Sequence, residues 1–153
     1  MNNSLYYGSN YAAGEVGQMH IRSGLFEKSA SVSALVQEAN RHDSSLNDGI
    51  KIFKAYEKGV EEILKTVDTF YMDLALGISN IIYVLNPSRI VIGGGISARE
   101  AFTDELRGYL EKVCRKDFLN GLDIRPAKYR NLSGMIGAMF HFLDMEEKRQ
   151  ISL

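Results

Sequence analysis

A glutamate that stands between two glycines near the start of the chain is the first side chain that could do chemistry. In the run from Gly14 to Gly17, the small neighbours let the backbone hold Glu15 rigidly toward a ligand. A carboxylate accepts hydrogen bonds from two adjacent hydroxyl groups, which is the pattern that a sugar offers. The alternative, which spacing alone favours, is a solvated carboxylate in a turn. Glu27 has the same two interpretations, its alternative being a capping or helix-dipole role.

Three consecutive glycines, Gly93 to Gly95, form the second feature. They follow a short β-branched run and precede Ser97 to Glu100, which match a capping box and predict the start of a helix. Glycines let a ligand approach the backbone, and a helix start offers unpaired amides at the positive end of its dipole. A glycine turn followed by a helix start therefore suits a phosphate or a nucleoside. The pattern lacks the Lys-Ser/Thr of a P-loop and the spacing of a dinucleotide fingerprint, so a tight turn without a ligand remains the alternative.

Other kinds of active site find little support in the sequence. His20, His42 and His141 are scattered, and none has a Cys, Asp or His at metal-ligand spacing. No Gly-x-Ser-x-Gly elbow is present to expose a nucleophilic serine, so a hydrolase triad is not indicated.

Charge, cysteine content and hydropathy limit the class of protein. The 153 residues carry 18 Lys and Arg against 19 Asp and Glu, and a net charge of -1 supplies no basic field for nucleic acid or anionic lipid. The single cysteine, Cys114, forms no internal disulfide and fits a reducing compartment, so we expect a cytoplasmic protein. Residues 74–85, the longest apolar stretch, fall short of the ~20 that span a bilayer, and the first residues do not resemble a signal peptide.

Periodicity and turn signals predict the elements that must position these residues. The expected helices are 31–42 with a serine cap, a short helix between Asp48 and Gly59, 60–85 ended by Asn86 and Pro87, 97–113, and 133–143. The expected strands are 5–7, 16–21, 89–92 and 122–129.

Three segments in this order resemble the ROK family of repressors, open reading frames and sugar kinases. Residues 5–17 are similar to the family's sugar-contacting segment, which runs into a Gly-Glu-x-Gly-His motif. Residues 85–97 are similar to its nucleotide-side glycine turn, and residues 133–138 to its final helix. The resemblance covers nearly all of the chain.

The resemblance implies a sugar-binding role for Glu15 and Glu27, which would hydrogen-bond sugar hydroxyls, and we count Gln18 with them. Family members with structural zinc use the motif's histidine and three cysteines. Here Gln18 replaces that histidine and residues 23–28 contain no cysteine, so we expect no zinc.

On the nucleotide side, the resemblance implies that Gly94 and Gly95 line the adenosine and phosphates of ATP, together with Gly93 and Gly134. The implied reaction is transfer of the γ-phosphoryl group of ATP to a sugar hydroxyl with Mg²⁺.

The fold implied by the resemblance is α/β and actin-like, with two domains of ribonuclease H type that close over sugar and ATP. Residues 1–153 resemble an incomplete second domain. The amino-terminal domain, with its phosphate-binding loop and the aspartate that accepts the hydroxyl proton, has no counterpart, so we expect no catalytic residue and no kinase activity from this chain alone. The terminal helix, residues 133–148, would cross back to the missing domain, and we expect its apolar face to be buried by self-association into a homo-oligomer.

The leading hypothesis is therefore the carboxyl-terminal half of an ATP-dependent ROK sugar kinase that acts on a hexose or a glucoside. The alternative is the sugar-sensing half of a ROK transcriptional repressor, in which a separate helix-turn-helix binds DNA. The missing cysteine cluster favours the kinase. A third hypothesis is a module that serves only for oligomerisation.

Overall fold

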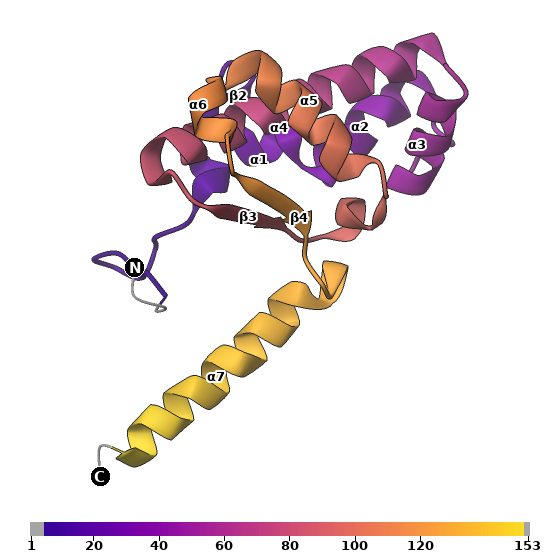
Figure 1. The fold of residues 1–153 in the computed structure, drawn as a ribbon. Helices are drawn as coiled ribbons and strands as arrows, with labels where there is room; N and C mark the ends of the chain where they lie inside the picture. The colour runs from indigo at the N-terminus through magenta and orange to yellow at the C-terminus, as the bar shows by residue number, and fades with distance from the viewer. Residues whose placement is uncertain (1–4, 152–153) are drawn as a thin grey trace.

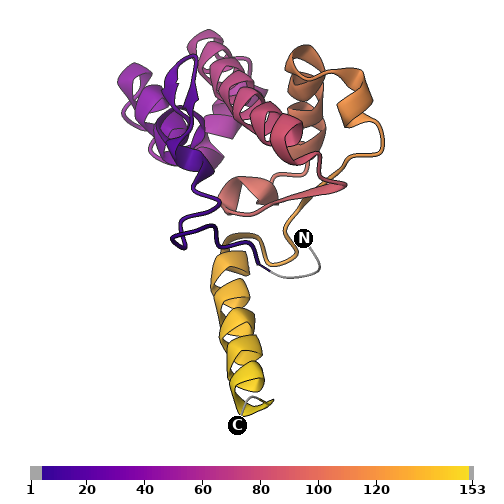
Figure 2. The same cartoon turned by 90° about the vertical axis from the view of Figure 1, so that its left-hand side faces the viewer.

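The chain folds as a helical layer packed over a small parallel sheet, with a final helix that projects from it (Figures 1 and 2). This computed structural model describes the backbone of residues 5–151 and the side chains of residues 5–146. The α-helices are α1 (Phe26–Ala30), α2 (Val32–His42), α3 (Gly49–Glu57), α4 (Glu61–Leu85), α5 (Phe102–Val113), α6 (Lys116–Leu119) and α7 (Ser133–Ile151). The strands are β1 (His20–Ile21), β2 (Gly24–Leu25), β3 (Arg89–Ile92) and β4 (Asp123–Pro126), and the 3-10 turns are η1 (Val16–Gln18), η2 (Gly95–Ala98) and η3 (Arg130–Leu132).

The long helix α4 is the centre of the core, as its periodicity predicts. Its apolar side chains recur at three and four residues, and α1, α2, α3 and α5 all pack against it. The fully buried side chains include Ile63, Val67, Tyr71 and Ile82 of α4. The helix ends at Asn86, which adopts a left-handed conformation with φ 41° before Pro87. Helices α1, α2, α3 and α5 are therefore positioned by their contacts with this central helix.

Local capping explains where two of the helices begin. The hydroxyl oxygen of Ser31 accepts a hydrogen bond from the Ala34 amide at the start of α2, and the Asp48 carboxylate accepts one from the Lys51 amide at the start of α3. A serine cap, Ser29 or Ser31, was predicted for the first helix and Asp48 for the second; the structure confirms both helices, with Ser31 as the capping serine.

Strands β3 and β4 pair in parallel, with Arg89 opposite Asp123 and Ile92 opposite Pro126. The Arg89 guanidinium donates to the Asp123 carboxylate at 2.6 Å, and Arg125 also pairs with Asp123. The carboxyl ends of both strands lead into the segments that hold the glycine turn and the start of α7.

Three of the predicted strands differ from the strands of the structure. Residues 5–7 form no strand, and residues 16–21 are divided between η1 and the two-residue strand β1, because Gly14 and the bond from the Gln18 amide to the Glu15 carbonyl make a tight turn. The strand expected at 122–129 covers only Asp123–Pro126, because the chain turns after Pro126.

The predicted helix at 97–113 begins five residues later than expected. Ser97 does not cap it; its hydroxyl donates to the Gly94 carbonyl at 2.7 Å and closes η2, so α5 starts only at Phe102. The capping-box prediction is therefore wrong.

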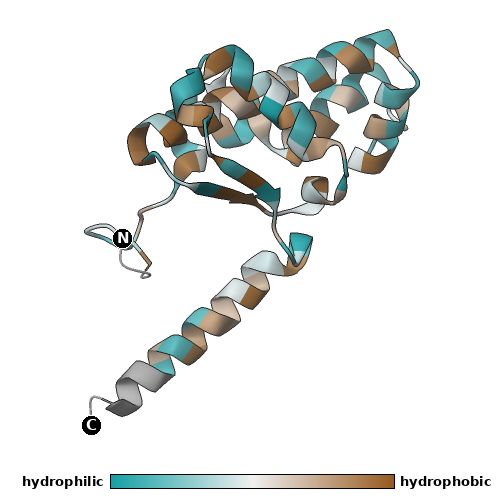
Figure 3. Ribbon diagram, viewed as in Figure 1, coloured by the Kyte–Doolittle hydropathy of each residue, from teal (hydrophilic) through white to brown (hydrophobic). Residues whose placement is uncertain are grey.

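Helix α7 continues to Ile151, beyond the periodic segment 133–143 and the end expected for the terminal helix at residue 148, and it leaves the body of the domain (Figure 1). Large apolar side chains on it lie in solvent, among them Met135, Met139, Phe140 and Phe142 at 52–68% exposure, and brown patches run along it in Figure 3. No helix in the described part of the chain is both long and apolar enough to cross a membrane.

Candidate functional site

The two glutamates predicted to bind sugar come from adjoining segments. Glu15 precedes η1, and its carbonyl accepts a hydrogen bond from the Gln18 amide at 3.1 Å. Glu27 stands on α1 beside Gly17, so close that a Cβ on Gly17 would lie 3.1 Å from the Glu27 Oε2. Within the described residues no group pairs with the side chain of Glu15, Gln18 or Glu27, and all three are exposed. Their polar atoms are therefore free to meet a ligand.

Gly17 serves this arrangement by its lack of a side chain. Its contact with Glu27 and the bond from the Phe26 amide to the Met19 carbonyl at 2.8 Å hold the turn against the start of α1. A larger residue at position 17 would displace the Glu27 carboxylate.

The anchor of this segment is a contact that sequence reasoning missed. The buried ring of Phe26 lies directly on the backbone of Gly77 in α4, where an added Cβ would meet three ring atoms at 2.1–2.4 Å. A glycine inside an otherwise strongly apolar helix lowers the stability of the helix. Such a glycine in the sequence could therefore have indicated that another group packs closely against α4. Gly77 thus makes room for the residue that fixes Glu27 to the core.

The glycine turn after β3 adopts a conformation that requires glycine at one position. Gly94 has φ 87° and ψ 171°, a region that other residues avoid. Its amide donates to the Arg130 carbonyl at 3.4 Å, and its carbonyl accepts from Ser97. Gly95 has no atom within 4 Å of where a Cβ would stand, so one side of the turn is open.

The helix that begins next to this glycine turn is α7, which is the last helix of the chain. A Cβ on Gly93 would lie 3.6 Å from the Arg130 carbonyl oxygen and 3.9 Å from the Ser133 Cβ. Ser133 opens α7 and is followed by Gly134, and its hydroxyl is buried without a hydrogen-bond partner among the described residues. The structure therefore places Gly93–Gly95 near the start of α7, where Gly134 lies, and this helix start differs from the one expected after the glycines.

An arginine behind the turn ties it to α3, α4 and α5. The Arg99 guanidinium pairs with both carboxylate oxygens of Glu105, lies 4.6 Å from the centre of the Phe53 ring, and approaches the Tyr71 hydroxyl at 3.4 Å. Burial, together with the neighbouring Glu105, raises the pKa of the Tyr71 hydroxyl well above its usual range, so it remains a neutral hydroxyl. This cluster holds the exit of η2 in place.

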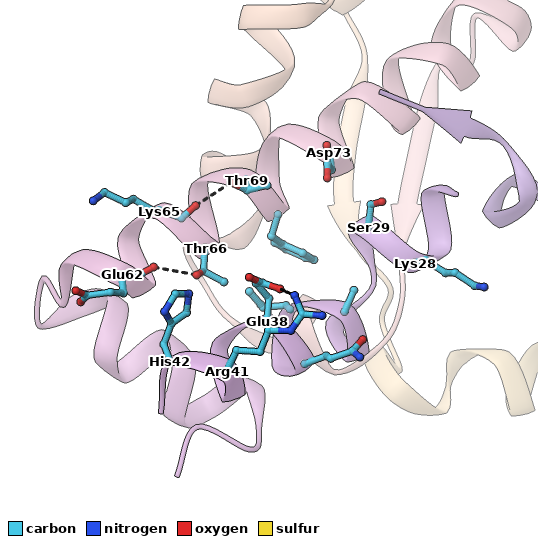
Figure 4. A pocket seen from close by; sticks show the side chains of 14 residues that line it. Lys28, Ser29, Glu38, Arg41, His42, Glu62, Lys65, Thr66, Thr69 and Asp73 are labelled. Carbon is cyan, nitrogen blue, oxygen red and sulfur yellow. Dashed lines mark hydrogen bonds and ion pairs between the residues drawn. The ribbon is translucent and has the colours of Figure 1, made fainter. Parts of the chain in front are cut away.

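The candidate sugar-binding glutamates and the glycine turn are separate in the structure. No described hydrogen bond or ion pair joins Glu15 or Glu27 to the glycine turn. Two open clefts, of about 600 and 850 Å³, are lined by other residues, chiefly from α1, α2, α4 and the β1–β2 hairpin. Figure 4 shows the cleft between α1, α2 and α4.

Comparison with known proteins shows that the chain is similar in sequence and in fold to sugar kinases. A β-glucoside kinase from Listeria monocytogenes is 30% identical over 160 aligned residues, which cover 97% of this chain and 53% of the relative. A solved L. monocytogenes protein, suggested to be an N-acetylmannosamine kinase, superposes with a TM-score of 0.81 and 28% identity over 95% of this chain and 52% of its own. A Streptomyces griseus ROK glucokinase, solved with glucose and AMPPNP, has a TM-score of 0.73 and 19% identity over 90% and 54%.

The chain spans about half the length of the curated relatives it matches. Its fold is accordingly part of the actin-like fold of ROK sugar kinases, and the fold prediction is confirmed. Because the model of the ROK family matches residues 1–145 continuously, the chain belongs to the ROK family.

Proposed function

We propose that this chain supplies the sugar-binding and nucleotide-binding half of an ATP-dependent sugar kinase acting on a hexose or a glucoside. The observation that carries the proposal is that two exposed carboxylates without a partner among the described residues come from adjoining segments: Glu15 precedes η1, and Glu27 on α1 packs against Gly17 of η1. Carboxylate oxygens that are fixed close to the backbone can accept hydrogen bonds from the hydroxyl groups of a sugar. The kinase names of the sequence relatives support the same class of reaction.

For the nucleotide, we propose the open side of the turn formed by Gly93, Gly94 and Gly95, with Gly134 at the start of α7. The backbone there carries no side chain that would keep a ligand away, and the first amides of α7 provide donors for an anion. A neighbouring ROK glucokinase structure holds AMPPNP, which supports an ATP-like ligand.

The side chains that could act as metal ligands determine which metal ions we expect. Within the described residues no group of three or more His, Cys, Asp and Glu side chains could hold a metal ion. Mg²⁺ would therefore accompany the phosphates of ATP. Zinc is not expected, because Gln18 replaces the motif histidine and Cys114 is buried at the end of α5.

Sugar binding is tested by titration calorimetry of the 153-residue chain with glucose and methyl β-glucoside. Charge-assisted hydrogen bonds contribute about 1.5–3 kcal/mol each, so Glu15→Gln and Glu27→Gln should each weaken binding by roughly ten- to a hundredfold. Glu111→Gln, an exposed change on α5, is the control and should bind normally. Equal binding by all variants would refute the site.

Gly95→Ala tests the nucleotide side. The new methyl group meets no atom of the chain within 4 Å, so a loss of AMPPNP affinity with unchanged stability would report a ligand at the turn. Unchanged affinity would refute it.

A coupled assay for ADP release tests the division of labour. We expect no sugar-dependent ATP turnover by this chain, because the proposed half has no residue to accept the hydroxyl proton. Turnover that Glu15→Gln abolishes would refute this expectation.

The repressor alternative shares the sugar pocket but requires no ATP. Sugar binding without AMPPNP binding would favour it. Failure to bind either ligand would favour the third hypothesis, a module for oligomerisation.

A further inference from the structure

A buried carboxylate on α4 lies where two open clefts meet, apart from the carboxylates and glycines considered above. Asp73 is only 7% exposed. It lines the cleft of about 600 Å³ between α1, α2 and α4, and also the cleft of about 850 Å³ between the β1–β2 hairpin and α4. Figure 4 shows its carboxylate across from Ser29 of α1. One acidic group is therefore accessible from two sides.

Within the described part of the chain, Asp73 accepts no hydrogen bond and forms no ion pair. Two hydroxyls of the same helix that line this cleft donate to backbone carbonyls instead: Thr66 donates to the Glu62 carbonyl at 2.9 Å, and Thr69 donates to the Lys65 carbonyl at 3.0 Å. A largely buried charge without a partner is costly. The Asp73 carboxylate therefore has no donor among the described residues, and a donor from a ligand would stabilise it.

The basic residues of the same cleft do not neutralise Asp73. Arg41 pairs with Glu38, and Lys65 pairs with Glu61 on the outer surface of α4. In Figure 4 the ammonium groups of Lys28 and Lys65 point away from Asp73.

We propose that the cleft around Asp73 is a separate binding site for a small ligand that carries a primary ammonium group. An ammonium group offers three N–H donors and the compensating charge, whereas an uncharged hydroxyl offers one donor and no charge. The hydroxyl oxygens of Ser29 and Thr69 line the same cleft and can accept the remaining donors. Leu35 and Phe70 provide an apolar wall for the carbon stem of the ligand.

The test is titration of the ¹⁵N-labelled 153-residue chain with ethylammonium chloride, followed by amide chemical shifts. We expect saturable shifts confined to residues near Ser29, Thr69 and Asp73. Asp73→Asn should weaken binding at least tenfold. Glu62→Gln is the matched control, because it removes the same charge from the exposed rim of the same cleft on the same helix, and should bind within twofold of the wild type.

Sodium chloride at equal ionic strength and glycerol separate the alternatives. Shifts reproduced by sodium chloride would indicate a general salt effect, and shifts reproduced by glycerol would indicate that hydroxyl donors suffice; either result overturns the proposal. Unchanged binding by Asp73→Asn also overturns it. If that variant does not fold, the wild-type titration decides, because absent or scattered shifts contradict a site at Asp73.

Discussion

The contact between Phe26 and Gly77 predicts that the methyl group added by Gly77→Ala has two opposing effects on stability. Replacing a glycine inside a helix by alanine gains about 1 kcal/mol of stability from backbone entropy. At Gly77, however, the new Cβ would lie 2.1–2.4 Å from three atoms of the Phe26 ring, far inside the ~3.5–4.0 Å of a normal carbon contact. The ring must move by more than an ångström or leave its site.

Either response costs at least as much as the helix gains. Accommodating an extra methyl group in a packed core costs about 1–3 kcal/mol, and expelling the ring forfeits about 1.5–3 kcal/mol of burial. Because the added Cβ would overlap three ring atoms, we expect a cost above the low end of these ranges. After the gain of about 1 kcal/mol, Gly77→Ala should lower the free energy of unfolding by about 0.5–2 kcal/mol. Urea denaturation followed by circular dichroism measures it.

Gly108 on α5 is the matched control for this experiment. It is exposed, lies inside a helix, and has no atom within 4 Å of where a Cβ would stand. Gly108→Ala should therefore raise the free energy of unfolding by about 0.5–1 kcal/mol. The same chemical change should thus act in opposite directions at the two positions. A Gly77→Ala chain as stable as the wild type would show that Phe26 does not rest on α4 as described, and would remove the proposed anchor of Glu27.

Gly94→Ala should lower the free energy of unfolding by about 1–3 kcal/mol, because alanine is strained at φ 87°; urea denaturation with no change would contradict the turn. The pKa of Asp123 is held below its usual range by hydrogen bonds from Arg125 and Arg89, so its contribution to stability is present above about pH 4 and lost below it. Between pH 5 and pH 2.5, the free energy of unfolding of Asp123→Asn should therefore fall less than that of the wild type. Equal losses in urea denaturation at the two pH values would contradict this role of Asp123. Light scattering after size exclusion should show an oligomer that Phe140→Asp on α7 dissociates; a monomeric wild type at high concentration would refute self-association.

The longer helices of this fold were largely predictable, because they depend on a periodic pattern or a local cap, whereas the short helices α1 and α6 were not predicted. The apolar side chains of α4 repeat over 25 residues and require burial against several partners. Ser31 and Asp48 cap their helices through bonds to residues only three positions away. Interactions of this range are visible in the sequence itself.

The turns were less predictable, since they depend on residues distant in the chain. Ser97 and Glu100 satisfy the capping-box pattern, yet the Ser97 hydroxyl bonds to Gly94 and delays α5 until Phe102. Gly94 in turn is held by the Arg130 carbonyl, a contact across 36 residues that no local pattern encodes. The side of the candidate nucleotide site that comes from η3 and α7 was therefore visible only through family resemblance.

Helix α7 links the two proposed sites through its own two contacts. Its first turn packs against Gly93, and farther along it His141 hydrogen-bonds the Tyr7 hydroxyl at 3.3 Å. Tyr7 belongs to the segment that leads to Glu15, and its carbonyl accepts a bond from the Ala13 amide at 3.1 Å. A partner that covers the exposed face of α7 would contact both the helix beside the glycine turn and the segment before the first glutamate.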